Sequence, residues 1–252
     1  MKSVYLNGVK IYFGPDKEDL VDLALKEKKI LIAITSEKIL LATDQTRNII
    51  NNNIGYTDGM GAVWALHRNG FKEAVKIRGC ELWLDIIRKV YKEKNFYLIG
   101  SSQNTINKTV DKLKKEFTGI NIVNFRNGFF KNDSEKKELL DDIVLKKPDI
   151  VFVAMGSPKQ ELFMSEMKKV HSAVYQGLGG SFDLYIGNVK PTPEWWNKIF
   201  KIEGLYRMLA DFTNKRRWQR EWICVKFLFV IWTNRINGEK LLNTKDEIKN
   251  LF

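Results

Sequence analysis

Three short segments combine charged or amide side chains with glycines, and each follows a run of residues typical of a buried strand. They are Thr57-Asp58-Gly59-Met60-Gly61, Gly156-Ser157-Pro158-Lys159-Gln160-Glu161 and Gly177-Leu178-Gly179-Gly180-Ser181-Phe182-Asp183. Glycines let backbone amides approach a ligand closely, and a helix N-terminus offers unpaired N–H groups to phosphate. A carboxylate such as Asp58 in the same place could act as a general base. For any one segment the alternative is a plain turn with an N-capping acid.

The sequence around these segments predicts an α/β fold. Strand-like runs at 30–34, 55–56, 96–100, 120–125, 149–155 and 172–176 alternate with helix-like stretches at 37–51, 61–69, 103–117 and 134–146. Ser134 is the expected N-cap of the last of these helices, and Pro158 suits the first turn of another. This alternation is typical of a mostly parallel, Rossmann-like sheet with helices on both faces. Because ligands bind at the carboxyl edge of such a sheet, we expect the three segments to meet there.

The two ends of the chain depart from this alternation. Strand-like residues on both sides of Asn7-Gly8 predict an N-terminal β-hairpin. After Pro191-Thr192-Pro193 there are only helix-like stretches. We therefore expect an α/β catalytic domain over 1–190 and a helical appendage over 191–252.

Charge distinguishes the appendage from the rest of the chain. The protein has a formal net charge of +12, and residues 190–252 hold thirteen Lys or Arg against seven Asp or Glu, together with five of the seven tryptophans. A basic, tryptophan-rich helical segment is typical of a protein that binds an anionic membrane surface, nucleic acid or a phosphorylated substrate. The alternative is a helical hairpin packed on the core, with its arginines merely solvated.

The composition limits the classes of protein to which the chain can belong. Two distant cysteines, Cys80 and Cys224, suit a reducing compartment and argue against a disulfide framework or a zinc site. The N-terminus has no signal-peptide pattern, and no run reaches the roughly 18–20 apolar residues that span a bilayer. We therefore expect a cytoplasmic protein.

Several common catalytic motifs are missing from the sequence. It has no P-loop, no complete G-x-G-x-x-G fingerprint, no G-x-S-x-G elbow and no Asp-x-Asp, and its two histidines, His67 and His171, stand apart. Without Asp-x-Asp, a bound sugar nucleotide must have its charge balanced by Lys, Arg and backbone amides. The residue patterns by themselves favour an α/β enzyme that binds a phosphorylated ligand.

The motifs resemble those of the WecG/TagA/CpsF glycosyltransferases, in the same order, from about residue 30 to 220. The matching segments are Asp58-Gly59-x-Gly61, Lys76-Ile77-Arg78-Gly79-Cys80-Glu81-Leu82, Gly156-Ser157-Pro158-Lys159-Gln160-Glu161, Gly179-Gly180-Ser181-Phe182-Asp183 and Glu203-Gly204-Leu205-Tyr206-Arg207. The resemblance implies inverting transfer of an N-acetylmannosamine-type sugar from a UDP donor to a polyprenyl-diphosphate-linked sugar. It further implies no metal and no cofactor, a place on the inner face of the cell membrane, and a role in teichoic acid, capsule or common-antigen synthesis.

Residue roles follow from the resemblance by position. Asp58 resembles the family's general base, Gln160 its substrate-contacting glutamine, and Asp183 lies near the expected uracil end. The remaining substrate-binding candidates are Thr35, Gly59, Lys76, Arg78, Gly156, Lys159, Glu161 and Gly179, where Lys76 replaces the family's usual arginine. Arg207, Arg217 and Arg220 are expected to hold the acceptor's diphosphate at the membrane.

Two alternative functions stay open at this point. The basic, Trp-rich tail is compatible with a nucleic-acid-binding protein, although the resemblance implies no nucleic-acid partner. The glycine-rich loops are also compatible with a soluble nucleotide-sugar enzyme such as an epimerase. The transferred sugar, the acceptor's terminal sugar and the choice between a monomer and a homo-oligomer are open as well.

Overall fold

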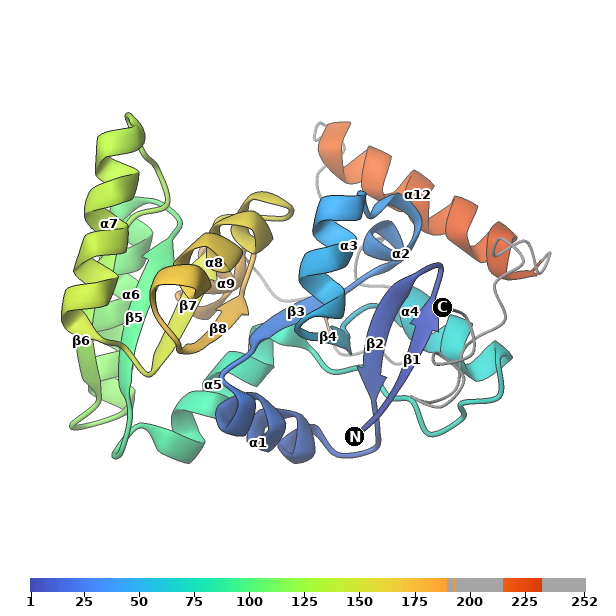
Figure 1. Ribbon diagram of the computed structural model, residues 1–252, viewed down its shortest axis with the longest axis horizontal. Helices are drawn as coiled ribbons and strands as arrows, with labels where there is room; N and C mark the ends of the chain where they lie inside the picture. Colours follow the sequence, from blue (N-terminus) through green and yellow to red (C-terminus); the bar gives the residue numbers. More distant parts are fainter. Residues whose placement is uncertain (190–192, 194–214, 233–252) are drawn as a thin grey trace.

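The computed structural model describes residues 1–189, 193 and 215–232 (Figure 1). Eight strands form one sheet in the order β1-β2-β4-β3-β8-β7-β5-β6. The strands are β1 (Lys2–Leu6), β2 (Val9–Phe13), β3 (Ile30–Ile34), β4 (Ile54–Thr57), β5 (Asn95–Gly100), β6 (Asn121–Arg126), β7 (Ile150–Ala154) and β8 (Val174–Gly177). β1 and β2 pair antiparallel as a hairpin, and the other neighbours pair parallel. The predicted parallel sheet and N-terminal hairpin are confirmed.

Helices cover both faces of the sheet. The helices of the described residues are α1 (Lys17–Glu27), α2 (Ser36–Leu41), α3 (Asp44–Asn51), α4 (Met60–Arg68), α5 (Gly79–Val90), α6 (Gln103–Glu116), α7 (Asp133–Lys146), α8 (Lys159–Val170), α9 (Ser181–Tyr185) and α12 (Lys215–Trp232). In Figure 1, α1 and α5 lie along the lower side of the sheet, whereas α3, α8 and α12 lie along the upper side.

Two apolar clusters fill the space between the sheet and these helices. Ile30, Ile32 and Ile34 of β3 point into the cluster that also contains apolar side chains of α2, α3, α4, α7, α8 and α12. Leu31 points the other way, into the cluster formed with α1, α5, α6 and α9. Because both faces are covered, the central strands are apolar throughout, as parallel strands in α/β proteins are.

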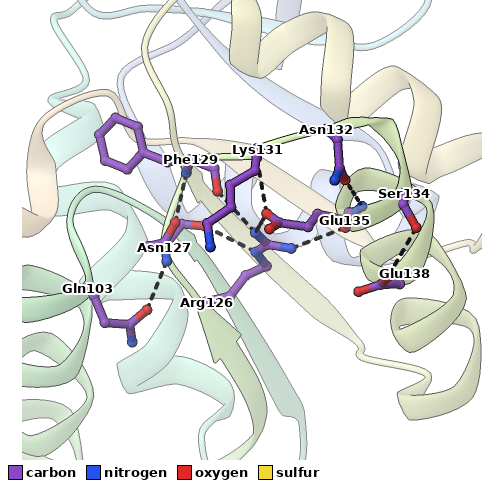
Figure 2. A network of polar contacts seen from close by, with 9 residues as sticks. All are labelled: Gln103, Arg126, Asn127, Phe129, Lys131, Asn132, Ser134, Glu135 and Glu138. Atoms are coloured by element: carbon purple, nitrogen blue, oxygen red, sulfur yellow. Dashed lines mark hydrogen bonds and ion pairs between the residues drawn. The ribbon is translucent and has the colours of Figure 1, made fainter.

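Two local expectations are wrong, and one expected strand is present with shifted bounds. The single helix expected over 37–51 is two helices, because Thr43 begins a new helix: its hydroxyl oxygen accepts a hydrogen bond from the Thr46 amide at 3.3 Å. The N-cap of α7 is Asn132, which accepts from the Glu135 amide at 3.0 Å, whereas the Ser134 hydroxyl donates to Glu138 (Figure 2). The strand expected at 172–176 is β8, which begins two residues later.

The chain leaves neighbouring strands β3 and β8 toward opposite faces of the sheet. After β3 it enters α2, whose Ile39 belongs to one apolar cluster. After β8 it enters α9, whose Phe182 belongs to the other cluster. Such a topological switch point is where open α/β sheets bind ligands, outside the carboxyl ends of the strands.

Candidate active site

Asp58 lies directly after β4, beside the end of β3. The backbone amides of Asp58 and Gly59 both donate to the Ile34 carbonyl, at 3.2 and 3.4 Å. The Oδ1 atom of Asp58 accepts a hydrogen bond from the Gly79 amide at 2.9 Å. Gly79 is the first residue of α5, so the carboxylate lies at the positive end of a twelve-residue helix, which favours negative charge there.

This contact bears on the alternative that Asp58 is merely a helix cap. Asp58 does bind a helix N-terminus, but that helix is α5, twenty-one residues along the chain. The helix that follows Asp58 directly, α4, has Gly59 as its N-cap, without a side-chain cap. The contact therefore fixes the carboxylate at the sheet edge through a long-range hydrogen bond.

The segment that leads into α5 is bound to the end of β4. The Thr57 hydroxyl donates to the Val75 carbonyl at 2.6 Å, and the Ile77 amide donates to the Thr57 carbonyl at 2.7 Å. Lys76 and Arg78 flank Ile77, so both predicted cationic residues lie on the segment next to Asp58. Arg78 also forms an ion pair with Glu81 in the first turn of α5.

Two glycines in this region lie so close to neighbouring side chains that a larger residue at either position would clash. A Cβ on Gly79 would lie 2.6 Å from the Tyr56 hydroxyl and 3.8 Å from the Asp58 Oδ1. A Cβ on Gly61 would lie 2.1 Å from the Ser36 Oγ and 3.2 Å from the Phe227 ring of α12. Burial, and then the charge of Asp58, raise the pKa of Tyr56 well above its ordinary value, so its phenol stays protonated.

Thr35, at the end of β3, faces the Asp58 loop. It is the N-cap of α2, and its side chain makes no capping hydrogen bond. A Cβ on Gly59 would lie 3.7 Å from the Thr35 Cα. The two predicted substrate-binding residues Thr35 and Gly59 are therefore neighbours.

Glu161 forms a buried ion pair that the sequence did not predict. Its Oε1 lies 2.7 Å from the Lys38 Nζ, and Lys38 also donates to the Ala33 carbonyl at 2.8 Å. The side chains of Lys38 and Glu161 are 14% and 3% exposed. Burial raises the pKa of Glu161, but the charge and hydrogen bond of Lys38, together with hydrogen bonds from the Glu161 backbone and from Gln160, outweigh burial and hold the pKa below its usual value. The second oxygen, Oε2, is buried and accepts no hydrogen bond from the described residues.

Gln160 connects the second and third segments. Its Oε1 accepts from the Gly179 amide at 3.0 Å, and its Nε2 donates to Glu161 at 3.2 Å. A Cβ on Gly177 would lie 2.5 Å from the same Nε2, so the loop after β8 packs tightly on this side chain. Gly156 and Gly179 both have positive φ, 77° and 57°, which glycine adopts without strain. Gln160 thus holds the loop in which Gly179 lies.

Asp183 is bonded on both oxygens. Its Oδ2 accepts from the Ser101 hydroxyl at 2.9 Å, and its Oδ1 accepts from Thr105 at 3.0 Å and from Asn188 at 3.1 Å. Asp183 therefore binds α9 to the loop after β5.

Lys159, at the start of α8, is exposed, and its Nζ lies 5.7 Å from the ring centroid of Phe130.

The C-terminal arginines fall largely outside the described residues. Arg207 lies outside them entirely; Arg217 and Arg220 belong to α12, but their side chains are not among those described. Phe227 and Ile231 of α12 are buried in the cluster shared with α2 and α4. On the outside of the same helix Trp218, Trp222, Val225 and Phe229 are exposed.

Sequence reasoning missed several residues that shape this site. Lys38, Ser36 and Tyr56 carry no local signal, because their partners come from other elements. The sequence of α5 did carry a local signal, because its apolar residues recur at helical spacing: Leu82, Trp83, Ile86, Ile87 and Val90.

Over residues 1–189 and the described part of 215–232, no three His, Cys, Asp or Glu side chains are grouped as a metal ion would need. None of the helices described there is long and apolar enough to cross a membrane.

The sequence model of the Glycosyl transferase WecG/TagA/CpsF family matches residues 15–241. The chain belongs to this family. WecG/TagA/CpsF proteins are glycosyltransferases of cell-surface polysaccharide synthesis, and they use nucleotide-sugar donors and lipid-linked acceptors in general. Membership favours sugar transfer over the two alternatives that the sequence left open, nucleic-acid binding and epimerisation.

Proposed function

We propose that this WecG/TagA/CpsF protein is an inverting, metal-independent transferase. It moves an N-acetylmannosamine-type sugar from UDP to a polyprenyl-diphosphate-linked sugar in teichoic acid, capsule or common-antigen synthesis. The observation that carries the proposal is the placement of Asp58 beside the end of β3, one of the two strands at the switch point, with its carboxylate fixed by the Gly79 amide. Thr35 and Gly59 lie beside it, and Lys76 and Arg78 lie on the adjoining segment.

The proposed chemistry uses Asp58 as the base. The acceptor hydroxyl attacks the anomeric carbon from the side opposite UDP, and Asp58 takes the hydroxyl proton as the new C–O bond forms. The bond between the anomeric carbon and the β-phosphate oxygen breaks, and UDP leaves with that electron pair. Backbone amides at the glycine-rich loops, together with Lys76, Arg78 and Lys159, balance the charge of the departing diphosphate.

The exposed apolar surface of α12 supports a place on the inner membrane face. Trp218, Trp222, Val225 and Phe229 are exposed, and the first turns of the helix carry Lys215, Arg216, Arg217 and Arg220. Tryptophans beside basic residues suit the headgroup region of an anionic membrane. Flotation with anionic phospholipid vesicles tests this: Trp222→Ser should lower the bound fraction, and unchanged binding would argue against a membrane role for α12. Arg207, Arg217 and Arg220 are the proposed contacts of the acceptor's diphosphate.

A donor screen tests the reaction itself. UDP release is measured for several UDP-sugars with a short-chain lipid-diphosphate-linked acceptor, with and without a chelator. We expect release from UDP-N-acetylmannosamine that depends on the acceptor and is unchanged by the chelator. Release without acceptor would contradict transfer to the lipid-linked sugar, and loss of release on chelation would contradict metal independence. Transfer restricted to a different sugar would contradict the N-acetylmannosamine-type donor.

A further inference from the structure

A lysine in α2 connects the end of β3 to the first turn of α8. The Lys38 Nζ donates to the Ala33 carbonyl of β3 at 2.8 Å and to the Glu161 Oε1 of α8 at 2.7 Å. Because the Ala33 carbonyl belongs to a central strand, the ammonium group that binds it has a fixed place relative to the sheet. Lys38 thus brings a positive charge to Glu161 from a different element of the fold.

Glu161 in turn fixes the orientation of the neighbouring amide. The same Oε1 that binds Lys38 accepts a hydrogen bond from the Gln160 Nε2 at 3.2 Å, and both Gln160 and Glu161 are buried. An ionised carboxylate can only accept hydrogen bonds, so Gln160 has to turn its NH2 group toward Glu161. The Gln160 Oε1 then faces the other way and accepts from the Gly179 amide at 3.0 Å. The orientation that holds Gly179 therefore depends on the carboxylate that Lys38 holds.

These side chains lie where β3 and β8 stop pairing. The register between the two strands ends with the Leu31–Gln176 pair, whereas each strand continues further beside its other neighbour, β4 or β7. Ala33, whose carbonyl binds Lys38, lies beyond that last pair. β3 and β8 are the two strands of the switch point, where an open α/β sheet binds its ligand.

The loop after β8 is packed on one side and open on the other. A Cβ on Gly177 would lie 2.5 Å from the Gln160 Nε2, so the amide has little room to shift without moving the loop. A Cβ on Gly179 or on Gly180 would meet no atom of the described residues within 4 Å. Movement of the Gln160 amide would therefore displace a loop that a ligand can reach.

We propose that Lys38 is a positioning residue for the nucleotide-sugar donor. It holds Glu161, Glu161 orients Gln160, and Gln160 keeps the loop of Gly179 in the conformation that binds the donor. Lys38 lies outside the motif segments that resemble the family, so the motifs alone do not indicate this role. The inference rests on the proposed function, because it takes UDP as the nucleotide of the donor.

Calorimetry of UDP binding to the full-length protein tests whether Lys38 acts through Gln160. Lys38→Met and Gln160→Leu should each raise the Kd for UDP about tenfold, as expected when one hydrogen bond to the loop is lost. Because the two residues act in series, Lys38→Met should raise the Kd no further in the Gln160→Leu protein. In steady-state transfer, Lys38→Met should raise the KM for the UDP-sugar and leave the KM for the lipid-linked acceptor unchanged.

A second variant separates positioning from stability. Lys38→Met/Glu161→Gln removes both buried charges and should regain most of the stability lost in Lys38→Met. Its Kd for UDP should nevertheless stay raised, because the amide introduced at position 161 can present either its oxygen or its NH2 group to Gln160. The same double variant replaces Lys38→Met in the comparison with Gln160→Leu if the single variant does not fold. Lys136→Met is the matched control, because Lys136 forms a partly exposed ion pair with Glu166 of the same helix, α8, and should leave UDP binding unchanged.

Three results would overturn the proposal. A wild-type Kd for UDP in Lys38→Met would show that Lys38 does not affect the donor site. Increases in Kd that multiply in Lys38→Met/Gln160→Leu would show that Lys38 acts independently of Gln160. UDP affinity that returns together with stability in Lys38→Met/Glu161→Gln would show a structural role alone. Failure of the wild-type protein to bind UDP would remove the proposed donor as well, whereas the other three results leave the proposed function intact.

Discussion

The buried pair between Lys38 and Glu161 allows a quantitative prediction about the stability of the site. The two side chains are 14% and 3% exposed, and their charged atoms lie 2.7 Å apart. Lys38→Met keeps the length of the side chain but leaves a buried carboxylate whose Oε2 already lacks a hydrogen bond from the described residues. Breaking a buried ion pair in this way costs about 3–5 kcal/mol of unfolding free energy. We expect Lys38→Met/Glu161→Gln to recover most of this loss.

The unfolding free energy lost in Lys38→Met should change with pH in a defined direction. In the wild-type protein burial raises the pKa of Glu161, but Lys38 and the hydrogen bonds from the Glu161 backbone and Gln160 together more than offset this, so the folded pKa is lowered. Glu161 therefore contributes stability above its unfolded pKa, about 4.3, and the contribution is lost as the pH falls through the folded pKa. In Lys38→Met burial, the largest influence on this pKa, acts without Lys38, so we expect the folded pKa to rise above the unfolded one. The difference between variant and wild type should thus be largest near neutral pH and shrink on acidification.

Urea unfolding followed by tryptophan fluorescence measures these free energies at several pH values. Lys2→Met is the matched control, because Lys2 and Glu73 lie 2.6 Å apart but are 71% and 33% exposed. We expect its effect to be much smaller than that of Lys38→Met. A loss below about 1 kcal/mol in Lys38→Met, or a double variant whose loss is the sum of the single ones, would refute the reasoning.

Two further substitutions test the packing of the loops. Gly61→Ala places a methyl group 2.1 Å from the Ser36 Oγ and should destabilise the protein by about 1–3 kcal/mol in urea unfolding, although alanine is the better helix former. Gln160→Leu removes the acceptor of the Gly179 amide and should cost about 1–3 kcal/mol. It should also lower the rate of transfer measured as UDP release.

Each of these substitutions has a control at a different site. Gly180→Ala adds the same methyl group where nothing lies within 4 Å, and it should be neutral. Gln45→Leu makes the same exchange as Gln160→Leu at an exposed position of α3. A stabilised Gly61→Ala variant would contradict the close contact with α2. A Gln160→Leu variant with wild-type stability and transfer would contradict the role of Gln160 in holding the loop after β8.

The sheet could be predicted from sequence because its central strands are buried on both faces. Ile30–Ile34 and Ile150–Ala154 consist entirely of apolar residues, and that pattern does not depend on distant contacts. The helix boundary at Thr43 was missed although its signal is local. A threonine followed by an acidic residue is typical of a helix start, and Asp44 lies in the first turn of α3.

Part of the site could not be predicted in the same way. Asp58 and the two other glycine-rich segments were found from residue types, whereas the Gly79 amide that binds Asp58 depends on the start of α5. Lys38 and Glu161 are separated by 123 positions in the chain, so no local pattern connects them. The lack of space for a side chain at Gly61 depends on α12 as well, since Phe227 of that helix lies against this glycine.

Asp58→Asn provides the most direct test of the proposed reaction. The asparagine oxygen can still accept the Gly79 hydrogen bond, so the exchange removes the ability to take a proton while keeping the local geometry. Single-turnover transfer from UDP-N-acetylmannosamine to the lipid-linked acceptor should fall at least about 100-fold, and UDP affinity should be unchanged. Asp44→Asn, at an exposed acid of α3, should transfer like the wild type. Near-wild-type transfer by Asp58→Asn would contradict the assignment of Asp58 as the base.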